Sequence, residues 1–375
     1  MTAARNVTRQ RLWGVIVAAA AMLAAPAAAD AATVTVEAGP DGRALQKQFQ
    51  SVFADANVFF NRAVTIHPGD RVSWQLNGLH TATFSPGKDK LPFVIPDPAN
   101  PVSGFLDAAG SPFWFNGQPR VIANPLAVTP QGPRTFRRNA LVSSGLPPIQ
   151  GKPKPYVVRF NRKGTFGYYC IVHPEMTGSV RVVGRKRAVL TPAQNRKAAR
   201  RAMTAALARA KQRASGPDQA SLGDVIQAGN DDRLGTAIFK YFPANKTVKA
   251  GSTVTMRMSP DSTEVHTFSF GPTNGKDQYL DQVGASLFTP QPGPGGQVTV
   301  VLEPRTFYPS EPPPAGVPAV TSTLHGNGFL NTGPLDLEAA SPLPSSTQVR
   351  FPEVGTFKYI CLIHPFMNGT VTVTP

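Results

Sequence analysis

The chain has 375 residues and a formal net charge of +16, with 38 prolines, 33 glycines and only two cysteines. The basic charge is uneven, because residues 185–213 contain ten basic residues and no acidic one, whereas residues 214–375 carry a net charge of −4. This distribution argues against nucleic-acid binding as the reason for the positive charge, and no nucleic-acid partner is expected. The length predicts two domains.

The N-terminal residues have the pattern of an export signal. Arg5, Arg9 and Arg11 precede an apolar run over residues 12–29, and small residues follow it. This pattern predicts a secretory signal peptide over residues 1–31 and an exported protein that is periplasmic, extracellular or on the cell surface. The alternative is an uncleaved membrane anchor, although the run is short for a full span.

The chain contains an internal repeat. Residues 58–70 match residues 240–252, and the segment that follows each copy alternates apolar and polar residues. That period of two is typical of a half-buried strand, and the repeat is long enough to be a domain duplication. We therefore predict two β domains, over residues 32–184 and 216–375. The alternating apolar positions are Val72, Trp74 and Leu76 in the first copy, and Val254, Met256 and Met258 in the second.

A basic segment over residues 185–215 connects the two copies. Thr191-Pro192 is a favourable helix start, which predicts a helix over residues 192–213. We expect a linker helix that packs on one domain. The alternative is weak contact of residues 185–213 with an anionic membrane or cell-wall polymer, although the mostly alanine apolar face argues against deep insertion. The residues predicted on that face are Ala199, Met203, Leu207 and Ala210.

Each copy also contains a long segment rich in proline and glycine. Residues 140–147 (ALVSSGLP) resemble residues 329–335 (FLNTGPL), so the two segments share part of their sequence. We expect these segments to form extended loops over one end of each domain.

The same Cys-x2-His-x2-Met motif occurs in residues 164–182 and in residues 355–373. Aromatic residues alternate along the segment before each cysteine, which places the thiol toward the core of a β domain. An upstream histidine lies in HTATF in the first copy and in HTFSF in the second. The candidate metal ligands are His80, Cys170, His173 and Met176 in the first copy, and His266, Cys361, His364 and Met367 in the second.

Two imidazoles and a thiolate with a long axial thioether form a blue-copper electron-transfer site. Zinc also accepts two histidines and a cysteine, but structural zinc sites usually contain paired cysteines and no methionine. The donor sets therefore favour copper over zinc.

The segment CLIHPFMNG (361–369) resembles the ligand loop of amicyanin, whereas CIVHPEMTG (170–178) departs from that loop at Glu175. On these motifs the chain resembles a tandem cupredoxin of the plastocyanin/azurin class. The resemblance implies an all-β fold of two tandem cupredoxin-like Greek-key β-sandwich or barrel domains. It implies two type 1 copper ions, one per domain, and single-electron transfer between transient redox protein partners. It also implies that a ligand histidine faces solvent where partners dock, beside Glu175 in one copy and Phe366 in the other.

The histidine content restricts the chemistry. The chain has six histidines, and only His67 and His325 remain once the ligands are assigned. There is no His-x-His pair, so neither the trinuclear cluster of a multicopper oxidase nor the catalytic copper of a nitrite reductase is expected. The sequence favours an electron carrier that is not an enzyme. Two alternatives stay open, namely extracytoplasmic copper binding or storage, and a secreted binding module with structural copper. The helix between the copies makes rapid copper-to-copper transfer doubtful unless the domains fold back on each other.

Overall fold

Strands dominate the computed structural model, and the all-β fold class predicted from the sequence is confirmed. Residues 32–375 form one compact unit. The predicted signal peptide lies outside the described residues apart from Ala31, and so does His325. The boundaries of the predicted domains stay a prediction. The structure describes residues 31–107, 110–148, 151–271, 279–293, 298–312, 320–322, 329–338 and 341–375.

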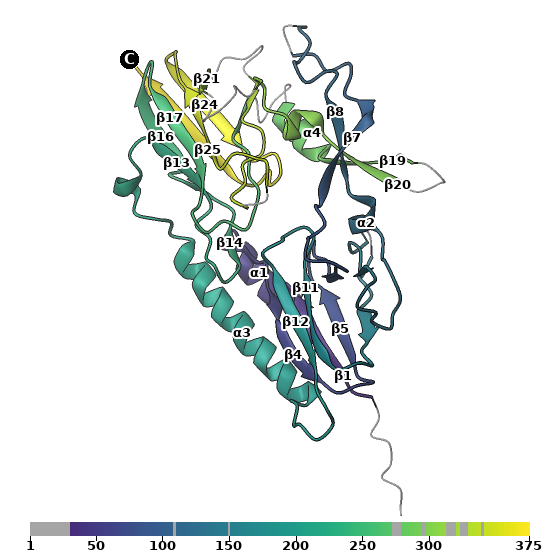
Figure 1. Cartoon of the computed structure of the whole chain (residues 1–375). Helices are drawn as coiled ribbons and strands as arrows, with labels where there is room; N and C mark the ends of the chain where they lie inside the picture. Colours follow the sequence, from purple (N-terminus) through teal and green to yellow (C-terminus); the bar gives the residue numbers. More distant parts are fainter. Residues whose placement is uncertain are drawn as a thin grey trace, which may run out of the picture. The chain divides into compact units, whose positions relative to one another are not determined.

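Two sheets enclose the core of the first half (Figure 1). Trp74 is fully buried between them, with the rings of Phe84, Tyr156 and Tyr168 at centroid distances of 5.7, 6.1 and 5.2 Å. Val72 and Leu76 are buried with it, as the alternating pattern predicted. One sheet has the order β10 (Tyr156–Arg159), β5 (Arg71–Leu76), β1 (Thr33–Ala38) and β3 (Phe59–Phe60). The other has the order β4 (Ala63–Ile66), β12 (Thr177–Val182), β11 (Gly164–Tyr169), β6 (Thr83–Phe84) and β9 (Val142–Ser143).

The second half repeats this strand order, with β21 added at the edge of one sheet. Val254, Met256 and Met258 are buried in its core, as predicted. In both halves the first strand pairs in parallel with the strand that carries the alternating residues. One sheet has the order β15 (Tyr241–Phe242), β13 (Val225–Ala228), β17 (Thr253–Met258), β23 (Ser346–Arg350) and β21 (Val320–Ser322). The other has the order β16 (Asn245–Lys249), β25 (Asn368–Thr374), β24 (Gly355–Ile360), β18 (Ser269–Phe270) and β22 (Leu330–Asn331).

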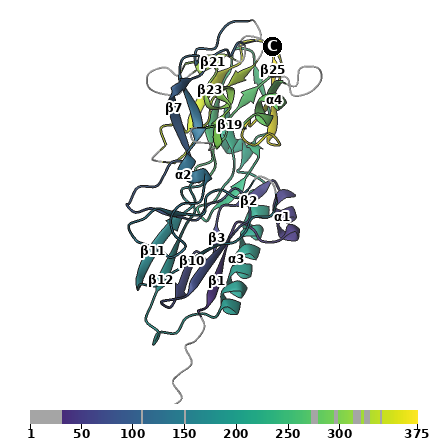
Figure 2. The same ribbon diagram turned by 90° about the vertical axis from the view of Figure 1, so that its right-hand side faces the viewer.

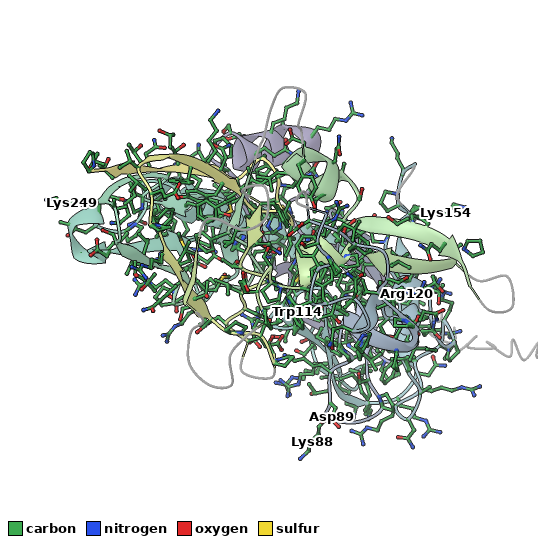
Figure 3. All side chains as sticks on the ribbon, turned by 90° about the horizontal axis from the view of Figure 1, so that it is seen from above. Lys88, Asp89, Trp114, Arg120, Lys154 and Lys249 are labelled. Atoms are coloured by element: carbon green, nitrogen blue, oxygen red, sulfur yellow. The ribbon has the colours of Figure 1, made fainter. Side chains whose placement is uncertain are left out.

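We expected the two proline- and glycine-rich segments to form separate extended loops, one on each domain. Instead, both contribute strands to one shared sheet. Val301 of the second segment pairs with Ile122 of the first. The Trp114 indole donates to the Pro309 carbonyl at 2.8 Å, and Arg120 donates to Gln291 at 3.0 Å. Trp114 and Arg120 are labelled in Figure 3. The shared sheet has the order β19 (Phe288–Pro292), β20 (Val298–Leu302), β8 (Pro119–Ala123) and β7 (Val94–Pro101). Three short helices belong to the same segments, α2 (Pro125–Val128), α4 (Tyr279–Ala285) and α5 (Pro304–Phe307).

The predicted helix is confirmed as α3 (Pro192–Arg213). A capping box starts it, because the Thr191 hydroxyl accepts from the Gln194 amide while the Gln194 side chain accepts from the Thr191 amide. The predicted apolar face is buried, together with Ala206. None of the helices in the described ranges is long and apolar enough to cross a membrane.

The buried face of α3 contacts both halves rather than one, which corrects the expected packing (Figure 2). Phe60 of the first half and Ile238 of the second belong to the same buried cluster as Met203. The two-stranded sheet of β2 (Ala54–Ala56) and β14 (Thr236–Ile238) joins the halves next to this cluster. Pairing across the repeat satisfies backbone groups that would otherwise be unpaired edges. Two further helical elements are α1 (Arg43–Gln50) and the 3-10 helix Gln219–Leu222.

Replacing Met203 with alanine is expected to lower the free energy of unfolding by about 2–5 kcal/mol, because a cavity forms where both halves meet the helix. Met203 is only 4% exposed. Denaturant unfolding of the full chain measures the change. Arg200→Ala, on the exposed side of the same helix, is the control and is expected to change stability by less than about 0.5 kcal/mol. Equal effects of the two substitutions would contradict the shared core.

Candidate metal centres

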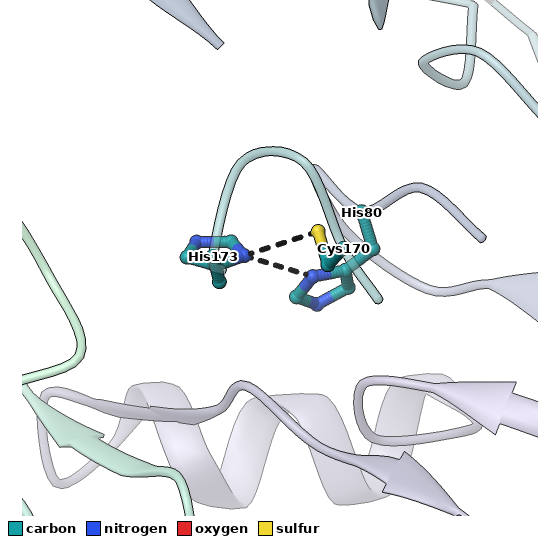
Figure 4. Close-up of side chains that lie close together, drawn as sticks. All are labelled: His80, Cys170 and His173. Atoms are coloured by element: carbon teal, nitrogen blue, oxygen red, sulfur yellow. Dashed lines mark hydrogen bonds between the residues drawn. The ribbon is translucent and has the colours of Figure 1, made fainter. Parts of the chain in front are cut away.

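Three predicted ligands of the first half point toward one another (Figure 4). His173 Nδ1 lies 3.2 Å from His80 Nδ1 and 3.6 Å from Cys170 Sγ. His80 precedes β6, whereas Cys170 and His173 lie in the loop between β11 and β12. The fold thus brings together groups about 90 residues apart, and we call them the first metal set.

The second half contains a matching group, the second metal set. Cys361 Sγ lies 3.8 Å from His266 Nδ1 and 3.7 Å from His364 Nδ1. The two Nδ1 atoms are 3.3 Å apart. The same three donor atoms therefore meet twice, with nearly equal spacings, although the two halves differ in sequence.

A threonine fixes each cysteine relative to its upstream histidine. The Thr81 hydroxyl accepts from the Ile171 amide at 2.8 Å, and the Thr81 amide donates to Cys170 Sγ at 3.3 Å. Thr267 makes the same two contacts, with Leu362 and with Cys361 Sγ, at 2.8 and 3.4 Å. An amide that donates to sulfur favours the thiolate form, which is the form that binds metals.

The methionines close the ligand loops. The Cys170 amide donates to the Met176 carbonyl, and the Met176 amide donates to the His173 carbonyl, both at 2.9 Å. Met367 makes the equivalent bonds in the second half, at 3.0 and 2.8 Å. Both methionine side chains are buried in the same clusters as the cysteines. The backbone thus returns each methionine to the side of the loop where its cysteine lies.

The geometry of each set fits a single soft cation. Donor separations of 3.2–3.8 Å suit three ligands that each lie about 2.0–2.3 Å from one ion. Thiolate and imidazole donors select copper, zinc or related metals over magnesium and calcium. The two His–Cys–His groups are therefore candidate sites for a transition metal.

Burial shifts the pKa values of the donor groups. It lowers the pKa of His80 and of His364 to about 4. Burial, followed by the charges of His80 and His364, lowers the pKa of His173 well below its usual value. Burial also raises the pKa of both cysteines. The imidazoles are thus neutral with a free lone pair, and a bound cation would supply the charge that stabilises a buried thiolate.

The upstream His80 is held tightly by its surroundings. Its Nε2 atom is buried and has no hydrogen-bond partner among the described residues. A Cβ on Gly39, where φ is +83°, would lie only 2.9 Å from that nitrogen. Glycine therefore allows the close approach that keeps the His80 ring in place.

Sequence reasoning missed a buried carboxylate that contacts both metal sets. Glu264 Oε1 lies 3.5 Å from His173 Nε2, and Glu264 Oε2 lies 3.7 Å from His364 Nε2. Asn57 donates to Glu264 Oε1 at 2.6 Å. Burial raises the pKa of Glu264 to about 8. The available signal was a break in the repeat, because Gly78 lies two residues before His80 where Glu264 lies two residues before His266.

The expected solvent-facing imidazole is not observed in the first half. His173 is only 8% exposed, because it lies against Glu264 of the second half. Beside the sites, Glu175 is exposed and pairs with Lys90 at 3.4 Å, and Phe366 is 53% exposed. His67 lies in a turn, with Nε2 2.9 Å from the Arg187 carbonyl, away from both metal sets.

Phe239 covers the second metal set. Its ring centroid lies 4.7 Å from that of His364, 5.7 Å from that of Phe366 and 6.3 Å from that of His266. The second set thus has an aromatic cover that ends in an exposed phenylalanine.

No family model matches the chain, and no curated protein matches it. Among solved structures, the chain is similar to an oxidised amicyanin variant, with 19% identity over 40% of this chain and 80% of that chain and a TM-score of 0.20. A reduced Cu(I) form of another amicyanin variant gives 18% identity, the same coverage and the same TM-score. A third variant, also in a Cu(I) form, gives 15% identity over 41% of this chain and 85% of that chain, again with a TM-score of 0.20. TM-scores of this size do not establish a shared fold.

Replacing Thr81 with valine is expected to lower the free energy of unfolding by about 1–3 kcal/mol, because the buried Ile171 amide loses its acceptor. It is also expected to weaken metal binding to the first set by about 10–100-fold, as supporting residues of metal sites do. Copper titration of Thr81→Val in a Cys361→Ser background measures the first set alone.

Thr165→Val, on the exposed face of the strand that leads to Cys170, is the matched control and is expected to leave both quantities unchanged. Equal weakening of the second set, measured in a Cys170→Ser background, would contradict a local role for Thr81.

Proposed function

We propose that the chain binds two copper ions and carries single electrons between transient protein partners. The observation that supports this most strongly is the duplicated set of a cysteine thiol and two imidazole Nδ1 atoms, within 4.8 Å of one another in each half. In this proposal His80, Cys170, His173 and Met176 hold one ion. The second ion is held by His266, Cys361, His364 and Met367.

Copper in such a site would supply a one-electron couple between its cuprous and cupric states, Cu(I) and Cu(II). The residues of the chain hold the ligands in place. The hydrogen bonds of Thr81 and Thr267 fix the thiolates, and the buried strands limit rearrangement of the ligands when the charge changes. A rigid, buried donor set suits electron transfer better than release of the ion.

The donor sets favour an electron carrier over an enzyme. One ion would use both imidazoles and the thiolate of each set, and His67 bonds elsewhere. Copper binding or storage is the second candidate, and it differs from the first only in the absence of reversible reduction. A secreted binding module with structural copper is the third.

Copper loading of the apoprotein is expected to give two ions per chain and an intense visible absorption from thiolate-to-copper charge transfer. Cys170→Ser and Cys361→Ser are each expected to remove one ion and about half of the absorption, because each thiolate serves one set. The double variant is the control that defines the background. Reversible reduction by one electron per ion would distinguish the carrier from a storage protein. A colourless zinc-selective protein, or full absorption in either single variant, would refute the proposal.

Export and anionic contact stay predictions. In an exported chain an unpaired thiol needs a reason, and metal binding supplies one; the two buried cysteines lie in separate clusters. N-terminal sequencing of the secreted protein tests export, and an intact Met1 would contradict cleavage after Ala31.

For the anionic contact, the exposed side of α3 carries Arg196, Lys197, Arg200 and Arg201. Failure of the full chain to bind anionic vesicles at low salt would exclude that partner.

A further inference from the structure

The two metal sets face each other across a single side chain. Each ligand-loop histidine directs Nδ1 toward its own cysteine and leaves Nε2 on the opposite side of the ring. The Nε2 atoms of His173 and His364 approach different oxygens of the Glu264 carboxylate, at 3.5 and 3.7 Å. These distances are contacts rather than good hydrogen bonds. One carboxylate therefore spans the space between the two sets.

Glu264 is fixed from the other half of the chain. Asn57 donates to its Oε1 atom at 2.6 Å and also contacts Thr263 at 3.3 Å. The backbone amide of Asn57 donates to the Gly235 carbonyl at 2.7 Å, next to the sheet of β2 and β14. The position of the carboxylate is thus set by the pairing that joins the halves.

The pair of Asn57 and Glu264 is where the repeat departs from symmetry. By the alignment of the two copies, the counterpart of Asn57 is Phe239, and the counterpart of Glu264 is Gly78. Two residues that break the repeat, one from each half, thus bond to each other between the metal sets. A structural repeat alone does not require this arrangement.

The burial of Glu264 makes a carboxyl group at this position notable. Glu264 is 9% exposed, and an ionised carboxylate in such a place is costly unless opposing charges or donors surround it. Its neighbours are Asn57 and the two imidazole edges that face away from the metal sets. With cations bound on the other side of both rings, the imidazole N–H groups would become stronger donors toward the carboxylate.

We propose that His173, Glu264 and His364 form an internal route by which one electron passes between the two metal sets. This inference rests on the copper-binding function proposed above. With copper in both sets, Cu(I) held by His173 and its set would be oxidised to Cu(II), and Cu(II) held by His364 and its set would be reduced to Cu(I), or the reverse. One electron moves, and no bond is formed or broken. The chain then acts as one two-centre unit.

The test uses the full chain loaded with two copper ions. A Met176→Gln substitution in every protein makes the two centres distinguishable, because the axial ligand tunes the reduction potential. A pulse of reductant delivers one electron per chain, and freeze-quench EPR follows its movement between the centres. Glu264→Leu is expected to slow this internal transfer by about tenfold or more, which corresponds to a barrier increase of about 1.4 kcal/mol. Glu264→Gln retains the shape and is expected to slow it less.

Glu175→Gln is the matched control, since it removes a carboxyl group from an exposed position of the first ligand loop. It is expected to leave the internal rate unchanged. If Glu264→Leu does not load two ions, Asn57→Ala replaces it, because that variant keeps the carboxylate and removes its fixing bond. The reciprocal marker Met367→Gln is expected to give the same dependence on Glu264.

An unchanged internal rate in a fully loaded Glu264→Leu or Asn57→Ala protein would overturn this inference while leaving the copper function intact. Equal slowing by Glu175→Gln would also overturn it, because the effect would then not depend on where the carboxyl group lies. A wild-type chain that binds no copper would instead refute the proposed function.

Discussion

The structure depends on the pairing of β2 with β14, which ties a strand of the first half to a strand of the second. Backbone hydrogen bonds give this contact a fixed register, and a fixed register sets the positions of the side chains on either side of it. Asn57 follows β2 directly, and its bond to Glu264 is therefore a consequence of that register. Without this pairing, the two metal sets would be separate features of one chain.

Three further contacts between the two halves support the same arrangement. The shared sheet of β7, β8, β19 and β20 joins the two insertions, and the buried face of α3 joins both halves near β2 and β14. A third contact is aromatic, because Phe113 and Phe115 lie in one buried cluster with Leu280 of the second half. Apolar burial on this scale is non-directional, so it stabilises the association of the halves, while the strand pairing defines its geometry.

Much of the fold was predictable because local pattern and burial agree. Val72, Trp74 and Leu76 alternate in sequence and are buried in the structure, and the helix after Thr191 has the predicted bounds. The cysteines and loop histidines of both metal sets could be selected from spacing, since a ligand loop is local in sequence, and His80 and His266 from their equivalent places in the repeat. The structure brings those side chains together, and their role as ligands is the proposal. The shared sheet was not predictable, because pairing of Val301 with Ile122 depends on contacts far apart in the chain. Glu264 was missed for the same reason, since nothing local shows that Asn57 and two histidines surround it.

The asymmetry between Gly78 and Glu264 has a consequence for how such a chain can diverge. Two copies of a repeat usually accumulate substitutions independently, each within its own core. Here one carboxylate from the second copy serves imidazoles of both copies and is held by an asparagine of the first. A change at either position is therefore felt in the other copy, and a compensating change must arise across the repeat rather than within it.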